Sequence, residues 1–200
     1  MALMYGNVLP QRADVAYLFT HTPPEEDSIL DRGAELYANN SAWKVVIGGG
    51  EEAYTTTEGA VICNGGKDWR QKLRQRGVAD DHIVTLPRPD PFQTRTESET
   101  VVDYMVQGDL RSVIVVACPL HYPRALLTVT SSVVKRGVKI RVYGQVGKPS
   151  NWFEGTAVSQ GQPVASRFEA LEGEWSRINN PDYGLSLTEF IDYCRWRDTV

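Results

Sequence analysis

One short segment of the sequence brings together an imidazole, a thiol and a guanidinium: Cys118-Pro119-Leu120-His121-Tyr122-Pro123-Arg124-Ala125. It follows the most apolar run of the chain, and Pro123 is typical of the first turn of a helix. A helix amino terminus favours anions, Arg124 can grip phosphate or carboxylate bidentately, and His121 can exchange a proton near neutral pH. We therefore predict His121 and Arg124 as catalytic residues; the alternative is that both side chains merely satisfy loop carbonyls.

Cys118 and Arg124 have the Cys-x5-Arg spacing of cysteine-dependent phosphatases, in which backbone amides cradle the phosphate and the thiolate attacks it. The match is poor, because Pro119 and Pro123 remove two amide donors and the loop contains no glycine. We retain Cys118 as a candidate ligand contact. The alternative is a small buried residue that packs at the end of a strand.

A second candidate is Gly48-Gly49-Gly50, which follows a short apolar run and precedes Glu51. Glycines let a ligand approach the backbone closely, so we predict Gly48, Gly49, Gly50 and Glu51 as ligand contacts. This is not the Gly-x-Gly-x-x-Gly fingerprint and no Walker lysine follows, so a plain tight turn is the alternative.

The third candidate is a helix start, Thr94-Arg95-Thr96-Glu97, which is expected to face the same cleft. Thr96 and Glu99 have the spacing of a capping box, which explains them without a ligand. Arg95 and Glu97 have no such structural reason. Because the whole helix start is expected to face the cleft, Thr94, Arg95, Thr96 and Glu97 are predicted as ligand contacts.

His21, which follows the first apolar run, is predicted as a further ligand contact at the same edge. His82, in contrast, precedes a predicted strand at the opposite rim and is expected at the surface. No His, Cys or carboxylate pair has a spacing that dictates a metal, so no metal ligand is predicted.

These candidates need a scaffold, and the chain alternates apolar runs with helical patterns joined by short loops. This alternation predicts an α/β fold, a three-layer sandwich with a mostly parallel Rossmann-like sheet and helices on both faces. Ligands of such sheets bind outside the carboxyl ends of the strands, where the candidates lie. The strands are expected at 15–19, 44–47, 83–86, 113–117 and 139–143, and the helices at 25–38, 68–76, from 96, and 123–135.

The length of 200 residues, with 42% hydrophobic and 23% charged residues, predicts one domain over 1–200 with a substantial core. The α/β core covers about 13–145. A C-terminal helical extension covers about 163–197, where Ser186 and Glu189 have capping-box spacing. Its first helix is marked by Val164, Phe168, Leu171, Trp175 and Ile178.

Net charge and cysteine usage limit the partners. With 21 basic and 25 acidic residues and a net charge of -4, the chain shows no general attraction to nucleic acid. No apolar run approaches the roughly 20 residues that span a bilayer. Residues 1–14 do not read as a signal peptide, and three widely spaced cysteines fit reduced thiols, so a cytoplasmic protein is expected. The oligomeric state is not indicated.

Several motifs in this order resemble the YdcF/SanA/ElyC-like family of domains of unknown function. They are Gly48-Gly49-Gly50, the helix end at Leu73 to Val78, Ile83, the threonine-rich helix start at 94–99, and the run Val113 to Ala117 followed by His121-x-x-Arg124-Ala125. The resemblance covers roughly 13–145 and implies a Rossmann-like fold with a conserved cleft. It implies envelope-related roles for some members and S-adenosylmethionine binding for one branch. Thr96, His121 and Arg124 match its site positions best, with Gly49 and Gly50 next.

The expected function is a cleft for an anionic or nucleotide-like small molecule, with S-adenosylmethionine as a possible cofactor through the resemblance. A hydrolase or transferase would use His121 and Arg124. The alternatives are a metabolite-sensing module without catalysis and a partner-binding module that uses the aromatic C-terminal helices.

Overall fold

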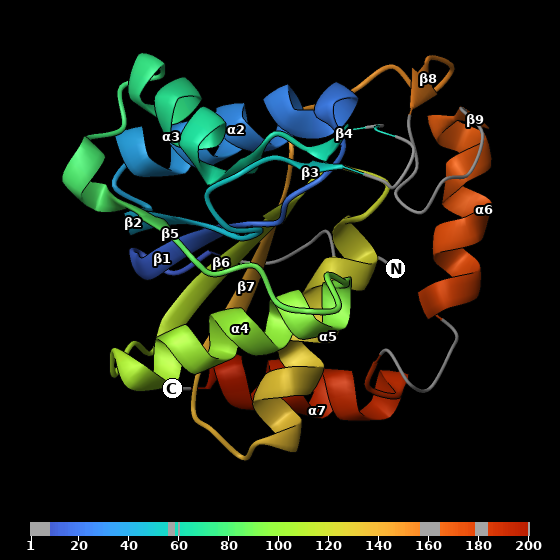
Figure 1. Cartoon of the computed structure of the whole chain (residues 1–200). Helices are drawn as coiled ribbons and strands as arrows, with labels where there is room; N and C mark the ends of the chain where they lie inside the picture. Colours follow the sequence, from blue (N-terminus) through green and yellow to red (C-terminus); the bar gives the residue numbers. More distant parts are fainter. Residues whose placement is uncertain (1–8, 56–58, 60, 157–164, 179–183, 200) are drawn as a thin grey trace.

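The computed structural model describes residues 9–55, 59, 61–156, 165–178 and 184–199. Residues 1–8, over which no signal peptide is expected, and Val164, the first residue of the predicted C-terminal helix pattern, lie outside these ranges. Within them the chain is an α/β three-layer sandwich, as predicted (Figure 1).

The central sheet has five strands, all parallel, in the order β5-β2-β1-β6-β7. The strand order reverses between β1 and β6, and this reversal is where parallel α/β sheets bind ligands. The strands are β1 (Ala13–Leu18), β2 (Ala42–Ile47), β5 (Ile83–Thr85), β6 (Ser112–Ala117) and β7 (Arg141–Val146).

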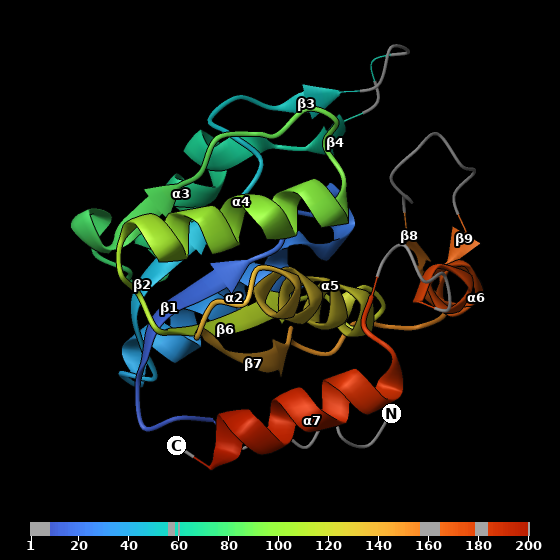
Figure 2. The same ribbon diagram turned by 90° about the horizontal axis from the view of Figure 1, so that it is seen from below.

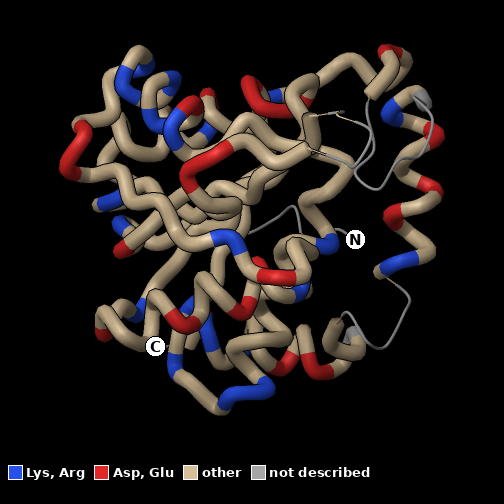
Figure 3. Tube along the Cα trace, in the orientation of Figure 1, with Lys and Arg blue, Asp and Glu red and all other residues tan. Residues whose placement is uncertain are grey.

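Helices cover both faces of the sheet (Figures 1 and 2), and basic and acidic residues are interspersed along the described chain (Figure 3). On one face lie α2 (Pro23–Ala38) and α3 (Gly65–Gln75). On the other lie α4 (Thr94–Gln107), α5 (Tyr122–Lys135) and α7 (Leu187–Asp198). Pro123 lies in the first turn of α5, as predicted.

Two hydrophobic cores follow from the alternation of side chains along the strands. In β1, Ala16 and Leu18 pack toward α2 and α3, whereas Val15 and Tyr17 pack toward α4 and α5. The central strand β6 is apolar on both faces, because helices cover both of them. The predicted buried run at 113–117 is therefore confirmed.

Smaller elements decorate this frame. A hairpin of β3 (Tyr54–Thr55) and β4 (Val61–Cys63) lies between β2 and α3. A short 3-10 helix, η1 (Asp80–His82), precedes β5. In the C-terminal part, β8 (Gly155–Thr156) pairs with β9 (Ala165–Ser166), which leads into α6 (Arg167–Ile178). Figure 1 shows α6 at the side of the sandwich rather than under the sheet.

Several element ends differ from the sequence-based expectation by one to three residues, and two of these differences have a cause that the structure shows. Helix α4 begins at Thr94, and its cap is formed by Gln93, whose backbone N–H donates to Thr96 Oγ1 at 3.2 Å. The predicted partner of Thr96, Glu99, instead pairs with Arg95 at 3.1 Å. The last sheet strand covers 141–146 rather than 139–143, because its pairing with β6 begins at Arg141.

Helix α7 covers the outer edge of β7. The Tyr193 hydroxyl accepts a hydrogen bond from Val142 N at 2.7 Å and donates one to the Ile140 carbonyl at 2.7 Å. Arg197 Nη1 donates to the Val142 carbonyl at 3.1 Å. The main-chain groups of Val142 therefore have side-chain partners at the edge of the sheet. The Ser186 and Glu189 capping box at the start of α7 is present, as predicted.

Candidate functional site

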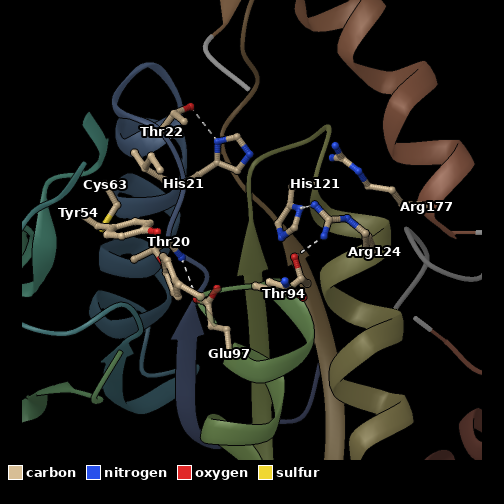
Figure 4. Close-up of a pocket in the computed structure, with 13 residues that line it drawn as sticks. Thr20, His21, Thr22, Tyr54, Cys63, Thr94, Glu97, His121, Arg124 and Arg177 are labelled. Carbon is tan, nitrogen blue, oxygen red and sulfur yellow. Dashed lines mark hydrogen bonds between the residues drawn. The ribbon is translucent and has the colours of Figure 1, made fainter. Parts of the chain in front are cut away.

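A cavity of about 340 Å³ lies at the carboxyl ends of the strands, where the strand order reverses. Its walls come from the loop after β1, the start of α4, the β6–α5 junction, the β3–β4 hairpin and α6 (Figure 4). The residues that line it are Thr20, His21, Thr22, Tyr54, Ile62, Cys63, Phe92, Gln93, Thr94, Glu97, His121, Arg124 and Arg177.

Five of the residues predicted from the sequence meet in this cavity: His21, Thr94, Glu97, His121 and Arg124. They converge because parallel strands place the loops that follow them at one edge of the sheet. His21 follows β1, whereas His121 follows β6, and these strands are neighbours in the sheet. The two imidazole rings lie 5.5 Å apart, measured between centroids.

Arg124 is buried and almost fully engaged by side chains of the protein. Its Nε donates to Glu174 Oε2 at 2.6 Å and its Nη2 donates to Glu174 Oε1 at 2.9 Å. Nη1 donates to the Thr94 hydroxyl, and Nη2 also lies 3.0 Å from His121 Nδ1. The expected bidentate grip on a carboxylate is present, but the carboxylate is the protein's own. We therefore correct the expectation that Arg124 is open to an anionic ligand.

Arg124 also determines how His121 can act. Because Arg124 donates to Nδ1, the neutral imidazole carries its proton on Nε2. Burial and the adjacent guanidinium of Arg124 both lower the pKa of His121, and the Glu174 carboxylate only partly opposes them. In Figure 4 the second ring nitrogen of His121 is turned away from Arg124. His121 is therefore a neutral group whose Nε2 is not used by Arg124.

His21 is the second neutral imidazole of the cavity. Burial, followed by the proximity of His121, lowers its pKa to about 3. Its Nδ1 lies 3.1 Å from the Thr22 hydroxyl, which fixes the ring relative to the start of α2.

Glu97 is a buried carboxyl group on the opposite wall. Its Oε1 accepts hydrogen bonds from Tyr17 Oη at 3.0 Å and from both the backbone N and the hydroxyl of Thr20 at 3.1 Å. All three hydrogen bonds fall on Oε1, so Oε2 has no hydrogen-bond partner among the described residues. Burial nevertheless raises the pKa of Glu97 to about 7, since those hydrogen bonds offset only part of the desolvation. Glu97 can therefore gain or lose a proton near neutral pH.

The aromatic end of the cavity is formed by Tyr54 and Phe92, whose ring centroids lie 5.7 Å apart in an edge-to-face arrangement. Arg88 covers the Tyr54 ring at 4.9 Å. The cavity thus has an aromatic end on the hairpin side and a cationic end at Arg124 and Arg177 (Figure 4).

Gly48, Gly49 and Gly50, which were predicted as ligand contacts, are not among the residues that line the cavity. A Cβ on Gly48 would lie 2.3 Å from Tyr17 Oη and 2.5 Å from Glu97 Oε1, so this glycine allows Glu97 to approach the strand end. Gly49 and Gly50 have positive φ angles of 86° and 76°. The Gly50 N–H donates to the Leu86 carbonyl at 3.0 Å, as in a structural turn.

The remaining predicted contacts also lie outside the cavity wall. Glu51 is exposed, Arg95 is exposed and paired with Glu99, and Thr96 caps its helix. Cys118 is fully buried in the core between the sheet and α2, and burial raises the pKa of its thiol well above the usual range. A raised pKa is the opposite of what a thiolate nucleophile needs, so Cys118 packs at the strand end.

Several site residues were missed by the sequence reasoning. Thr20 adjoins His21 and Phe92 lies two residues before Thr94, so position alone could have indicated them. Cys63 and Tyr54 lie in the β3–β4 hairpin, which the sequence does not mark with a clear periodicity. Glu174 and Arg177 belong to the C-terminal extension, and their spacing of three residues on a helix is equally typical of a surface ion pair.

Among residues 9–55, 59, 61–156, 165–178 and 184–199, no group of three or more His, Cys, Asp and Glu side chains is placed to hold a metal. No helix in this part of the chain is long and apolar enough to cross a membrane. Comparison of the sequence with protein-family models finds no match, and comparison with curated proteins finds none either.

Proposed function

We propose that this chain binds a small anionic or nucleotide-like ligand in the cavity and acts on it as a hydrolase or transferase. The observation that carries the proposal is the convergence of His21, His121 and Glu97, from three separate segments, on one cavity at the reversal of the strand order. Cavities that combine apolar walls, a few convergent polar groups and displaced pKa values are the usual sites of ligands and catalysis.

The two ends of the cavity favour a ligand with two chemical parts. Tyr54 and Phe92 suit a planar ring, whereas the cationic end suits a phosphate or carboxylate. The volume of about 340 Å³ suits a small molecule. S-adenosylmethionine, which the resemblance to the YdcF/SanA/ElyC-like family suggests, has a planar ring and a carboxylate. Tyr54 and Phe92 would contact its ring, so it belongs among the ligands to test.

The titratable groups of the cavity favour catalysis over ligand binding alone. A neutral His121 can donate a hydrogen bond through its Nε2–H to a reacting oxygen, while Arg124 holds its Nδ1. Glu97, with a pKa of about 7, is present in both protonation states near neutral pH. Arg124 therefore serves as a positioning residue for His121 in this proposal.

The first test is a thermal-shift screen with nucleotides, sugar phosphates and S-adenosylmethionine. A ligand at a hundred times its dissociation constant adds about 2.7 kcal/mol to the free energy of unfolding. The shift is expected to vanish in the double variant Arg124→Gln with Glu174→Gln, which removes both buried charges together and leaves neither unpaired.

The control is Arg136→Gln, which removes an exposed partner of Asp103 far from the cavity and should keep the ligand shift. Turnover of a stabilising ligand should then be lost in His121→Ala, with the circular dichroism spectrum unchanged. Full turnover in that variant would exclude His121 from catalysis.

A metabolite-sensing module is the second candidate, and the engaged state of Arg124 favours it. A ligand that approaches Arg124 meets a network that already links α4, α5 and α6 through Thr94 and Glu174. Ligand binding could therefore be transmitted to α6 without any reaction. Stabilisation by a ligand that is recovered chemically unchanged would support this candidate.

A further inference from the structure

Two arginines line the cationic end of the cavity, but their donors differ in availability. Arg124 donates hydrogen bonds through its Nε, Nη1 and Nη2 to Glu174, Thr94 and His121. Arg177 makes one hydrogen bond among the described residues, from Nη1 to Glu174 Oε1 at 2.8 Å. Since a guanidinium has five N–H donors, Arg177 retains most of its donors for another partner.

The two arginines also differ in burial, and the more exposed one is again Arg177. The Arg124 side chain is 10% exposed, whereas the Arg177 side chain is 24% exposed and reaches the cavity from α6. Figure 4 shows the Arg177 guanidinium directed from α6 toward the side of the cavity that holds the two imidazoles. An entering anion therefore meets Arg177 without breaking an existing contact.

Direct binding of an anion by Arg124 would have a high energetic cost. Glu174 is 3% exposed; burial alone would raise its pKa, but the charge of Arg124 and the two hydrogen bonds that Arg124 donates hold this pKa well below the usual range. Drawing Arg124 away would leave this carboxylate charged, buried and beside the arriving anion. Removing one partner of a buried ion pair is strongly destabilising, so the Arg124 pairing should survive ligand binding.

The charges of the cluster are consistent with one bound anionic group. At the cationic end of the cavity, Arg124, Arg177 and Glu174 sum to a net charge of +1, because two guanidinium groups share one carboxylate; Glu97 lies on the opposite wall and is outside this sum. His21 and His121 add no charge, since both pKa values are lowered. Their remaining ring nitrogens can still supply hydrogen bonds to the ligand.

We propose that Arg177, on the C-terminal helix α6, is the residue that contacts the anionic group of the ligand, a phosphate or a carboxylate. Glu174 and Arg124 are its positioning residues: Arg124 fixes Glu174, and Glu174 fixes Arg177. This inference rests on the proposed function of the cavity and deepens it. It makes the C-terminal extension a contributor to ligand specificity, although the acid-base groups come from the α/β core.

The test is isothermal titration calorimetry with inorganic phosphate, and with acetate in a parallel titration. Arg177→Gln should weaken phosphate binding at least tenfold, because a charge-assisted contact is lost. Arg177→Lys should recover part of the affinity, since it keeps the charge without the planar fork. Both variants are expected to fold, because Glu174 retains its two hydrogen bonds from Arg124.

The matched control is Arg195→Gln. Arg195 pairs with Asp192 at 3.0 Å with the same three-residue spacing, but it lies on the exposed face of α7. This variant should bind phosphate as the unaltered chain does.

Two failures can be told apart. Unchanged phosphate affinity in Arg177→Gln, with loss in the double variant Arg124→Gln with Glu174→Gln, would assign the contact to Arg124 and overturn the inference alone. Absence of binding of either anion to the unaltered chain would overturn the inference, and it would overturn the proposed function too if the thermal-shift screen also finds no anionic ligand.

Discussion

At the scale of single residues, burial and hydrogen bonding act in opposite directions on the pKa of Glu97. Burial raises its pKa to about 7, against the hydrogen bonds from Thr20 and Tyr17. A folded-state pKa above the unfolded value means that folding binds a proton. The stabilising contribution is therefore complete below about pH 4.5 and is lost as the pH rises through about 7.

We expect Glu97→Gln to remove this pH dependence, because the amide oxygen keeps the hydrogen-bond acceptor but cannot ionise. The variant should match the unaltered chain at pH 4 and exceed its free energy of unfolding by on the order of 3 kcal/mol at pH 8. Urea denaturation at both pH values measures the difference. Parallel pH profiles for the two proteins would show that the carboxyl group titrates near its ordinary value.

Cys118 gives a second residue-scale prediction. Its thiol is fully buried with a raised pKa, so it should not react with a thiol reagent in the native chain, and Cys194, which is partly exposed, should react first. Cys118→Ala should cost about 1 to 2 kcal/mol through the small cavity that it leaves. Ligand-induced stabilisation should be retained. Rapid native labelling of Cys118, read by mass spectrometry, would contradict this placement.

Sequence reasoning located the residues that sit next to strand ends and missed those that reach the site from elsewhere. His121 and Glu97 were predictable because a strand end or a helix start has a local sequence pattern. Glu174 comes from a helix fifty residues after Arg124, and no local pattern encodes so distant a contact. The glycines at 48–50 were interpreted as ligand contacts because a close approach of protein and a close approach of ligand require the same residue type.

At the scale of elements, Gly144 determines how α5 sits on β7. A Cβ at Gly144 would lie 2.2 Å from Tyr122 Oη and 2.9 Å from its ring carbon Cε2. Tyr122 is buried and is the first residue of α5, directly after His121. The absence of a side chain on β7 therefore fixes the start of the helix that carries the predicted catalytic residue.

Gly144→Ala should lower the free energy of unfolding by about 1 to 3 kcal/mol, because the buried Tyr122 ring must shift. It should also weaken ligand binding through the displaced helix start. Gly173→Ala is the matched control, since nothing lies within 4 Å of its added Cβ and it lies in helix α6. That substitution should stabilise the chain by about 0.4 to 1 kcal/mol. Thermal denaturation of both variants gives the comparison.

A buried ion pair joins the C-terminal elements to helix α2. Arg167 Nε, at the start of α6, lies 2.6 Å from Glu25 Oε1 in the first turn of α2. Glu25 is completely buried and also accepts a hydrogen bond from the Thr156 hydroxyl at 2.9 Å. This contact helps to hold α6, and with it Arg177, over the cavity.

Arg167→Gln should therefore cost about 3 to 5 kcal/mol, because it leaves a buried carboxylate without its charge partner. The double variant Glu25→Gln with Arg167→Gln should cost less than the sum of the two single variants. Chemical denaturation of all four proteins measures the coupling energy. Strict additivity would mean that the pair does not act as a unit.

Most of the elements were predictable because apolar periodicity is local. The strands at 44–47 and 113–117 lie within the observed strands β2 and β6, and both predicted C-terminal helices have counterparts in the described residues. The ends were less predictable, as the start of α4 illustrates. Its cap is Gln93, whose backbone N–H donates to Thr96 Oγ1, and not the predicted pair of Thr96 and Glu99.

At the scale of the whole molecule, the cavity lies where the strand order reverses. At the edge of the sheet, side chains of α7 bind main-chain groups of β7 and of the residue before it. Tyr193→Phe removes the hydroxyl that serves Val142 N and the Ile140 carbonyl. We expect a loss of about 1 to 3 kcal/mol, because buried main-chain groups lose their partner. Amide hydrogen exchange should accelerate at Val142 and stay unchanged in β1. Equal protection of Val142 in both proteins would contradict this role of Tyr193.

Both borders of the sheet carry an arginine that occupies a main-chain oxygen. Arg197 covers the Val142 carbonyl on β7, and on β5 Arg70 Nη2 donates to the Ile83 carbonyl at 2.8 Å. Charged side chains in these positions deny another polypeptide a template for strand addition, the first step toward fibrillar aggregates. The protection of β7 against strand addition is thus tied to α7, a helix made well after the strand, and a nascent chain acquires that protection only once α7 has been synthesised.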